Sequence, residues 1–465
     1  MIALILILLD FLAVLASYQL SYLIRTSVLP AIITFPEPQP WYLFNPIWLP
    51  LVFMFFFWFE GLYSKRLTLW DEVRHIWKGL FLASLSIFAI VSLGRLVSST
   101  SRTVLLLTFF NLLWILPLLR MLGKKIMFLS SLFRRKVLIL GAGLTGELVQ
   151  KTLSKEKNMG YEVVGYLDDD ARKIKKNIIN VKVLGKISEV DKYLVKGMEV
   201  ILAIPGMKAE KLVRLVNHMQ KKVVKVSFIP DLFGIPFFEG DMDFFFENHL
   251  LVLNIRNNLK NWGNKILKKI FDIVLSVPLF LVLLPVIIIL AALVKFGSKG
   301  SVFYVTDRIG KDGSLFKFYK FRTMYIGGDE ILKKVLSHSK SKKKEWDTYF
   351  KLKDDPRVTG FGKFLRKYSL DELPQILNII KGDMSLIGPR PYLPRESNAI
   401  GDYADVITQV APGVTGLWQV SGRNKMTFKE RLVMDSWYIQ NWSLWLDVVI
   451  LIKTVKAVFK REGAY

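Results

Sequence analysis

The first part of the chain is dominated by four long apolar segments. They cover about 2–23, 44–63, 79–97 and 104–122, and each has close to the roughly 20 residues that a helix needs to cross a bilayer. Four buried helices of a water-soluble domain are the alternative, but Trp residues gather near the segment ends, as they do at membrane interfaces. The pattern predicts a four-helix transmembrane bundle within residues 1–130.

The charges between these segments predict their orientation. The connection from Pro30 to Pro46 has no Lys or Arg, whereas the loop after the second segment and the stretch after the fourth are rich in both. Because cytoplasmic loops carry the excess of Lys and Arg, both ends of the bundle are expected in the cytoplasm. The first segment has no basic leader and no small-residue cleavage site, so a retained helix is expected and not a signal peptide.

From Lys136 the pattern changes to short β-branched runs separated by helical stretches. The predicted helices lie near 145–153 and 209–220, and the predicted strands at 136–140, 163–167, 181–184, 199–204 and 223–229. Strands that alternate with helices imply a parallel sheet. Residues 136–258 are therefore predicted to form a Rossmann-like α/β domain.

The first predicted strand runs into Gly141-Ala142-Gly143-Leu144-Thr145-Gly146. Glycines at this spacing let the backbone turn tightly and present a helix N-terminus to phosphate. Asp168 follows the second strand, where an acidic side chain could meet a ribose hydroxyl. Two interpretations stay open: a nucleotide-binding site, and a degenerate nucleotide fold kept for packing or assembly.

A fifth apolar segment, 273–294, differs from the first four. Lysines flank it on both sides, which argues against a simple crossing. Pro278 and Pro285 lie inside it, and each proline removes a backbone donor and kinks a helix. The segment predicts a re-entrant helix over 266–296, with its membrane kink at Pro285; a fifth spanning helix is the alternative.

Composition narrows the chemistry. The 465 residues contain 65 Lys and Arg against 39 Asp and Glu, a formal net charge of +26, which suits either nucleic acid or the anionic inner leaflet of a membrane. The apolar segments favour membrane lipids, and no nucleic-acid partner is expected. Cys is absent and the four His are scattered, which excludes disulfides and cysteine nucleophiles and argues against a zinc site or a histidine triad.

Three motifs after the fifth segment combine acidic, basic and aromatic residues. In the first, Phe316 to Met324, aromatic and cationic side chains are interleaved, and Lys320 and Arg322 are among the cations. Such a strand is expected to have one packed face and one face offered to anions. A strand face exposed only to water is the alternative.

The second motif is Ser369-Leu370-Asp371-Glu372. Ser369 and Glu372 have capping-box spacing, which predicts that Asp371 and Glu372 lie in the first turn of a helix. The helix N-terminus would keep Asp371 ionised and able to attack phosphorus, and adjacent carboxylates suit Mg²⁺. A helix cap without catalytic chemistry is the alternative.

In the third motif, Pro389 and Pro391 stiffen the backbone on both sides of Arg390. Its guanidinium, held in one direction, could make a bidentate contact with phosphate. Further on, the glycine-rich stretch 411–424 contains Arg423. This stretch could hold a nucleotide diphosphate and its base, or it could be a structural turn.

Together these motifs resemble the bacterial sugar transferase family, the monotopic phosphoglycosyl transferases, and in particular its large members. The likeness is strongest from about Ile266 onwards, so 264–465 is expected to be the catalytic domain, and the order of bundle, Rossmann-like module and catalytic unit is similar as well. Many members have Ser-Pro at the helix break where this chain has Leu284-Pro285. The kink should survive, but a hydroxyl that could satisfy a freed carbonyl is missing.

The resemblance implies roles for single residues. Asp371 corresponds to the nucleophile and Glu372 to the acid that helps to hold Mg²⁺. Arg366, Lys320 and Arg390 correspond to basic residues of the family's substrate site.

The resemblance also implies a two-step exchange on the cytoplasmic face of the bacterial inner membrane. Asp371 would attack the β-phosphate of a UDP-sugar, release UMP and hold the phosphosugar until undecaprenyl phosphate accepts it. This is the initiating step of O-antigen, capsule or exopolysaccharide synthesis. UDP-galactose and UDP-glucose are the expected donors, between which no residue decides, and a homodimer is an open option.

The end of the chain is rich in Trp and Tyr, and a largely apolar stretch, Leu446–Phe459, follows. An interfacial membrane helix would have this pattern, and a core helix with a charged face is the alternative.

Two rival functions have to be weighed. A membrane-anchored NAD-dependent nucleotide-sugar dehydratase would need a Tyr-x-x-x-Lys pair beside its cofactor, but the match, Tyr349 and Lys353, lies outside the predicted Rossmann-like domain. A non-catalytic assembly factor would be favoured by a substitution in the Asp-Glu pair, and that pair is intact.

Overall fold

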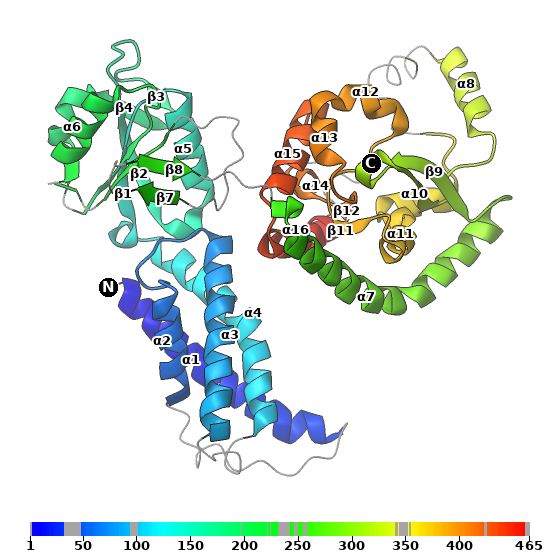
Figure 1. Ribbon diagram of the computed structural model, residues 1–465, viewed down its shortest axis with the longest axis horizontal. Helices are drawn as coiled ribbons and strands as arrows, with labels where there is room; N and C mark the ends of the chain where they lie inside the picture. Colours follow the sequence, from blue (N-terminus) through cyan, green and yellow to red (C-terminus); the bar gives the residue numbers. More distant parts are fainter. Residues whose placement is uncertain are drawn as a thin grey trace. The chain divides into compact units, whose positions relative to one another are not determined.

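The structure, a computed structural model, describes residues 2–31, 48–93, 101–195, 197–220, 222–223, 225–230, 242–245, 250–253, 258–339, 343, 352, 355–422 and 426–460. The chain divides into two compact units, Met1–Phe233 and Gly234–Tyr465. The first unit combines a helix bundle with a β-sheet, and the second contains one long apolar helix and the predicted catalytic residues (Figure 1).

The bundle of the first unit consists of α1 (Ile2–Leu23), α2 (Trp48–Phe59), α3 (Leu69–Leu93) and α4 (Arg102–Met127). The facing sides of these helices share one apolar core. Their outward sides are apolar as well, with exposed side chains that include Leu8, Trp58, Phe81 and Trp114. Helices that are apolar on all sides are suited to lipid.

By length and composition, four helices in the described part of the chain could cross a membrane: Ile2–Ala31, Leu69–Leu93, Arg102–Met127 and Trp262–Gly297. This confirms three of the segments predicted for the bundle. The remaining one, 44–63, is a helix of only 12 residues in its described part, and residues 44–47 lie outside that part.

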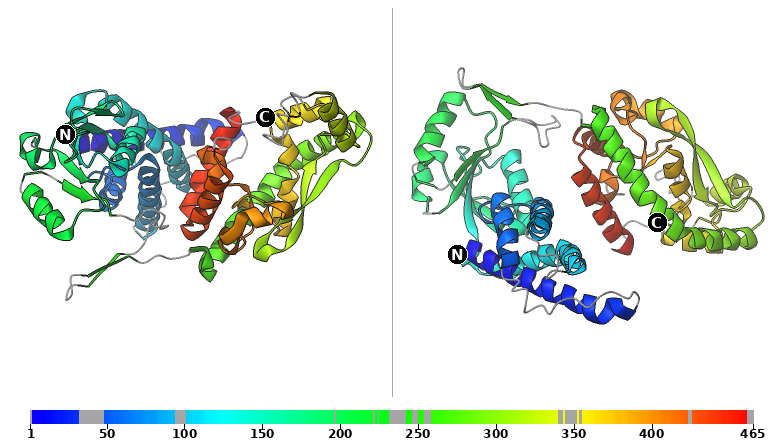
Figure 2. Two further views of the ribbon diagram at one scale, coloured as in Figure 1. Left: turned by 90° about the horizontal axis from the view of Figure 1, so that it is seen from above. Right: turned by 60° about the horizontal axis from the view of Figure 1, so that its bottom comes forward.

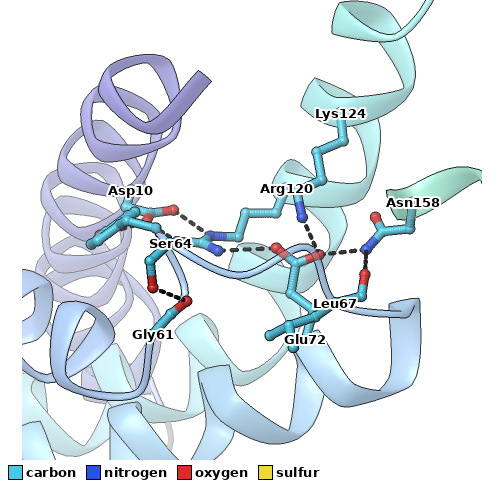
Figure 3. A network of polar contacts seen from close by, with 9 residues as sticks. Asp10, Gly61, Ser64, Leu67, Glu72, Arg120, Lys124 and Asn158 are labelled. Carbon is cyan, nitrogen blue, oxygen red and sulfur yellow. Dashed lines mark hydrogen bonds and ion pairs between the residues drawn. The ribbon is translucent and has the colours of Figure 1, made fainter. Parts of the chain in front are cut away.

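A network of buried charges ties three helices of the bundle together at one end (Figure 3). Arg120 of α4 donates from Nε to Asp10 of α1 (2.9 Å) and from Nη1 to Glu72 of α3 (3.0 Å). Lys124 donates to the other oxygen of Glu72 (2.7 Å), and these four side chains are buried. Asn158, from the short helix η6 (Lys157–Met159) below the sheet, also donates to Glu72 (2.6 Å).

A second contact joins the bundle to the sheet. Arg66, in the loop between α2 and α3, donates to the main-chain oxygens of Met159 (2.6 Å) and Gly160 (2.9 Å). The side chain of Asn158 also donates to Glu72, so the bundle binds η6 at two neighbouring residues, Asn158 and Met159. This explains why bundle and sheet form one compact unit.

The sheet has the strand order β3-β4-β2-β1-β5-β6. All neighbours pair in parallel except the edge strand β3. The parallel order β4-β2-β1-β5-β6 is that of a doubly wound sheet, as the predicted strands and helices require. The bounds are β1 (Arg135–Leu140), β2 (Tyr161–Leu167), β3 (Asn177–Ile178), β4 (Val181–Gly185), β5 (Glu199–Leu202) and β6 (Lys225–Phe228).

Two helices cover opposite faces of this sheet (Figure 1). Val137 and Ile139 of β1 pack on the side of α5 (Leu144–Lys155), whereas Leu138 and Leu140 pack on the side of α6 (Ala209–Gln220). Alternate residues of a strand point to opposite faces, so a strand buried on both sides is apolar throughout, which is the pattern by which β1 was predicted.

The second unit begins with the hairpin β7 (Met242–Phe245) and β8 (Leu250–Leu253), which the sequence had assigned to the α/β domain ending at 258. Its further elements are α7 (Trp262–Gly297), β9 (Phe303–Ile309), β10 (Leu315–Phe321), α8 (Gly328–His338), α10 (Gly360–Lys367), η10 (Leu370–Glu372), α11 (Gln375–Lys381), β11 (Ser385–Ile387), α12 (Ser397–Ile400), α13 (Ala404–Ile407), β12 (Gly413–Thr415), α14 (Leu417–Ser421), α15 (Phe428–Gln440) and α16 (Leu444–Lys460).

The helix α7 contains the predicted re-entrant segment. It is helical over 36 residues, and it changes direction part-way along, as Figure 1 and the right-hand view of Figure 2 show. Pro278 and Pro285 lie inside it, and prolines kink helices in this way. Ile287, Leu290 and Val294 pack against the core near β10, α10 and α11, while the other sides remain apolar and exposed.

The C-terminal helix α16 differs from the predicted interfacial helix. Asp447 is fully buried in it and accepts hydrogen bonds from Tyr438 (2.7 Å) and Trp442 (3.0 Å). Tyr438, Trp442 and Ile450 belong to the apolar core of the second unit. The described part of α16 is therefore a core helix. Its apolar side packs in the core, and its buried carboxylate is bound there by two aromatic donors.

Candidate active site

Asp371 lies in the 3₁₀ helix η10, between α10 and α11. The predicted capping box is not formed: Ser369 has a positive φ of 55°, and its side chain makes no cap. A residue in this left-handed conformation does not have the extended backbone that an N-cap needs. The Asp-Glu pair thus occupies a tight turn before α11 and not the first turn of a capped α-helix.

Three charged side chains lie near Asp371 and influence its pKa: Lys320, Glu372 and Arg366. Lys320 of β10 places its Nζ 2.6 Å from Oε1 of Glu372 and 3.9 Å from Oδ2 of Asp371. Arg366, in the last turn of α10, donates from Nε to Thr323 (2.9 Å), and its charge acts on Asp371. The structure therefore brings together four residues that the sequence singled out.

Burial raises the pKa of the Asp371 carboxyl; Lys320 opposes this shift, Glu372 adds to it, and Arg366 opposes it as well. Only 14% of the Asp371 side chain is exposed. The sequence led us to expect a helix N-terminus that keeps the group ionised. In the structure, Lys320 and Arg366 are the side chains that lower this pKa, whereas burial and Glu372 raise it.

Lys320 lies on a face of β10 that the sequence did not predict. Residues two apart on a strand share a face, so Lys320 lies with Phe316 and Phe318, both of which are buried. Its Nζ is 5.5 Å from the centroid of the Phe318 ring. The cation that meets the Asp-Glu pair is thus on the packed, aromatic face, whereas Lys317, on the other face, forms an exposed ion pair with Asp307.

Arg322 has a different role from the predicted phosphate contact. Its guanidinium is buried and donates to the main-chain oxygens of Ser298 (2.7 Å) and Lys299 (2.8 Å) and to the Ser298 hydroxyl (2.9 Å). Carbonyl groups at a helix C-terminus have no partner within the helix. Arg322 supplies one for α7 and is thereby turned away from the Asp-Glu pair.

Arg390 follows β11 and belongs to a second cluster of side chains. Its guanidinium lies 6.0 Å from the Tyr392 ring and 5.9 Å from the Trp418 ring, and 3.7 Å from Glu396. With 27% of its side chain exposed, Arg390 can reach a ligand. Its main-chain N–H is bound by the buried Asp435 (3.1 Å).

Arg308 of β9 connects the two clusters, and the sequence gave no signal for it. Its guanidinium lies 5.1 Å from the Phe318 ring, the same ring that Lys320 approaches, and it donates to the main-chain oxygen of Pro391 (3.1 Å), next to Arg390. Burial lowers the pKa of Arg308, and Arg390 lowers it further. The pairing of β9 with β10, which places Arg308 opposite Phe316, could not be read from spacing alone.

The glycine-rich stretch after residue 411 has a packing role in its described part. A Cβ on Gly413 would lie 2.0 Å from the main-chain N of Gly388, and one on Gly416 would lie 2.4 Å from the Gly388 oxygen. Both glycines allow the chain before Arg390 to run directly against β12. This favours the structural alternative for these glycines; Arg423 lies outside the described residues.

Within the described ranges, no three His, Cys, Asp or Glu side chains converge as a metal site made by protein alone would require. Asp371 and Glu372 nevertheless suit Mg²⁺, which is commonly held by one or two carboxylates, with water and substrate phosphate completing its shell. Glu372 is the more accessible of the two, with 39% of its side chain exposed against 14% for Asp371. A cation bound there would share these oxygens with Lys320. Mg²⁺ stays a prediction.

The glycine loop of the sheet has the predicted tight turn. Gly141 has a φ of 103°, and a Cβ on Gly146 would lie 2.0 Å from the Gly141 oxygen. Asp168, at the end of β2, accepts a hydrogen bond from the N–H of Ala142 (2.7 Å) and pairs with Lys173 (3.2 Å). The acid expected to meet a ribose thus already binds its own loop, and neither interpretation of the loop is excluded.

Residues 263–461 match the family model described as bacterial sugar transferase, and residues 51–230 match one described as a CoA-binding domain. The chain belongs to the bacterial sugar transferase family and is an enzyme. The second match begins in α2 and ends beyond β6, so it covers parts of both bundle and sheet.

The particular relatives agree in their names. The undecaprenyl-phosphate galactose phosphotransferase of Salmonella typhimurium is 36% identical over 406 residues, which cover 87% of this chain and 84% of that protein. The UDP-glucose:undecaprenyl-phosphate glucose-1-phosphate transferase of Escherichia coli is 29% identical over 345 residues, 71% of this chain and 69% of that protein. The exopolysaccharide production protein ExoY of Sinorhizobium fredii is 46% identical over 198 residues, 43% of this chain and 88% of that protein.

Proposed function

We propose that this chain transfers a sugar 1-phosphate from a UDP-sugar to undecaprenyl phosphate, through a covalent intermediate on Asp371. The observation that carries the proposal is the buried Asp371 carboxylate next to Lys320, with Arg366 close enough to act on its charge. Burial raises the pKa of this carboxyl and the two cations lower it, and a buried carboxylate held beside cations is suited to nucleophilic attack on a phosphate. The names of the relatives support the same reaction.

In the first step, a carboxylate oxygen of Asp371 attacks the β-phosphorus of the UDP-sugar. The bond between this phosphorus and the bridging oxygen breaks, and UMP leaves with the electron pair. In the second step, an oxygen of undecaprenyl phosphate attacks the same phosphorus and the Asp371 carboxylate is released. Splitting the exchange lets one anion-binding site serve two bulky substrates in turn.

The basic residues have separate parts in this proposal. Lys320 and Arg366 hold Asp371 ionised before the attack, and Arg390 binds the phosphate or nucleotide of the donor. Mg²⁺, held by Glu372 with Asp371, would neutralise the diphosphate when bound. The transferred sugar is galactose or glucose in this proposal, because both occur in the names of the relatives.

We infer that α7 is a re-entrant helix and that the second unit lies on the cytoplasmic face of the inner membrane. The bend of α7 and its apolar exposed sides support this, as do the lysines at both ends, Lys265 and Lys299. A monotopic helix would bring Asp371 level with the lipid headgroup, where the acceptor phosphate lies.

The test is UMP release by the full chain in nanodiscs with Mg²⁺ and undecaprenyl phosphate, across a panel of UDP-sugars. We expect release from one donor, a loss of at least about 10³-fold in Asp371→Asn, and wild-type rates in Asp402→Asn, which changes an exposed carboxylate. With donor alone, the intact mass of the wild-type chain should rise by one phosphosugar. Activity that survives in Asp371→Asn would rule out the nucleophile, and silence across the panel would rule out the reaction.

A further inference from the structure

Asp435 is a buried carboxylate beneath the Pro-Arg-Pro element, and no motif pointed to it. It lies on α15 with 1% of its surface exposed. Its Oδ2 accepts two hydrogen bonds, one from the main-chain N–H of Arg390 (3.1 Å) and one from the hydroxyl of Tyr392 (2.8 Å). One oxygen atom thus fixes the backbone of Arg390 and the ring of Tyr392 relative to each other.

The Arg390 guanidinium lies near one ring that Asp435 holds, Tyr392, and near the Trp418 ring. It is 6.0 Å from the Tyr392 ring and 5.9 Å from the Trp418 ring. The guanidinium of Arg431 also lies near the Trp418 ring, at 5.0 Å. Arg431 and Asp435 are four residues apart on α15 and therefore share one face of this helix. Two features therefore restrict the orientation of Arg390: the prolines on both sides of it, Pro389 and Pro391, and the helix α15, whose Asp435 accepts from its N–H and whose Arg431 lies near the same Trp418 ring.

The other oxygen of Asp435, Oδ1, is buried, and it has no hydrogen-bond partner among the described residues. A carboxylate kept only for stability would be expected to satisfy both oxygens, because an incompletely paired buried charge is costly and an apolar residue is often cheaper. Asp435 supplies a fixed acceptor for two donors, the Arg390 N–H and the Tyr392 hydroxyl. A buried carboxylate that lowers stability but fixes these two groups is suited to a positioning role.

We propose that Asp435 is a positioning residue that directs Arg390 at the donor's phosphate. The proposal rests on the proposed function, in which Arg390 binds the UDP-sugar. Asp435 itself touches no substrate and acts through the Arg390 main chain and the Tyr392 ring.

The accepted hydrogen bonds carry this role, and the negative charge does not. Burial raises the pKa of Asp435 to about 7, so the group is only partly ionised near neutral pH, and Oδ2 accepts in either form. An amide oxygen can accept the same two bonds. We therefore expect Asp435→Asn to keep kcat/KM for the UDP-sugar within about tenfold of wild type, whereas Asp435→Ala loses about 100-fold.

A double-mutant cycle decides whether Asp435 acts through Arg390. Arg390→Ala, Asp435→Ala and the double variant are compared in kcat/KM for UMP release, with Asp402→Ala as an exposed control. We expect kcat/KM of the double variant to be no more than about threefold below that of Arg390→Ala alone. Once the Arg390 side chain is gone, the loss of a residue that only positions it should have little further effect. Losses that multiply would show an independent structural effect and overturn the proposal.

A milder variant covers the case in which Asp435→Ala does not fold. Tyr392→Phe removes one donor and keeps the ring, so it should raise KM for the UDP-sugar by about three- to tenfold in wild type and leave KM unchanged in Arg390→Ala. An equal rise in both backgrounds would contradict the proposal. If the wild-type chain released no UMP, the proposed function would fail, and the same cycle measured on UDP affinity by calorimetry would still decide the positioning role.

Discussion

At the scale of single residues, the charge of Asp371 is set by opposing neighbours. Burial raises the pKa of its carboxyl, and Lys320 is the largest of the groups that lower it. Lys320 reaches Asp371 because it shares a strand face with Phe316 and Phe318, whose packing holds that strand in place. Among the side chains, Lys320 therefore opposes the effect of burial on the pKa of Asp371 most strongly.

Replacement of Lys320 should move the pH dependence of the reaction. Attack needs ionised Asp371, so activity falls on the acid side as pH drops through its raised pKa. In Lys320→Met that pKa rises further, because the opposing cation is gone, and the acid limb of the kcat/KM profile should move to higher pH. At neutral pH we expect a loss of about 10- to 100-fold.

Lys317→Met is the matched control for this experiment, since Lys317 is on the same strand but on its exposed face. Its profile should coincide with that of wild type. An unmoved acid limb in Lys320→Met would show that Lys320 does not control the ionisation of Asp371.

Arg322 shows how a residue in a catalytic motif can have a structural role. In Arg322→Met, the carbonyl groups at the end of α7 lose their partner, which should lower the free energy of unfolding by about 2–3 kcal/mol. KM for the UDP-sugar should stay within about twofold, whereas Arg366→Met should impair catalysis with less effect on thermal unfolding. Thermal melts and UMP release together distinguish the structural role of Arg322 from the catalytic role of Arg366. A large rise of KM in Arg322→Met would instead support the predicted contact between Arg322 and phosphate.

At the scale of elements, α7 links the membrane to the site. Its second half packs with Phe321, Leu365 and Ile376, which lie on β10, α10 and α11, the elements that carry or flank Lys320, Arg366 and Asp371. A shift of α7 would therefore reach the nucleophile through packed side chains.

If α7 is re-entrant, as proposed, both of its ends are accessible from one side of the membrane. The chain has no Cys, so Lys265→Cys and Lys299→Cys each introduce a single thiol. We expect an impermeant maleimide to label both in inside-out vesicles and neither in right-side-out vesicles. Labelling of the two positions from opposite sides would establish a spanning helix.

The charge network of the bundle is the second element-scale feature (Figure 3). Arg120→Met leaves Asp10 buried without its cation and takes one of two cations from Glu72, which should destabilise the first unit by about 3–5 kcal/mol. The combined Asp10→Leu/Glu72→Leu/Arg120→Met/Lys124→Met variant should recover much of this loss, because no charged member of the network is then left buried without a partner. Thermal unfolding in detergent checks both; a single variant as stable as wild type would contradict the network.

At the scale of the whole molecule, the chain divides into two compact units. The proposed nucleophile and its cations all lie in Gly234–Tyr465, and the bundle with its sheet lies in Met1–Phe233. The Sinorhizobium relative matches 43% of this chain but 88% of its own length, so that protein is much shorter than this chain.

A chain that begins at Asn258 should therefore still release UMP. We expect kcat within about tenfold of the full chain in nanodiscs, because every proposed catalytic group is retained. Asp371→Asn in the shortened chain should be inactive, as in the full one. A well-folded but silent fragment would show that the first unit contributes to the site.

Much of the fold was encoded locally. Apolar runs of membrane length predicted α1, α3, α4 and α7, and short β-branched runs separated by helical stretches predicted the parallel strands, because burial on one or both faces of an element is written directly in its sequence. The Asp-Glu pair and the basic motifs likewise marked the second unit as the catalytic one.

The sequence by itself thus indicated the apolar segments of membrane length, the parallel strands and the Asp-Glu pair with its basic motifs, since these follow from local patterns of polarity. Only the tertiary structure decided that Lys320 meets Glu372, that Arg322 caps α7, and that Arg308 and Asp435 join the site. Strand pairing and helix packing bring together residues far apart in the chain, and no local spacing encodes which partner a charged side chain will meet. The network around Arg120 belongs to the same class, because its members come from three helices and a loop of the sheet.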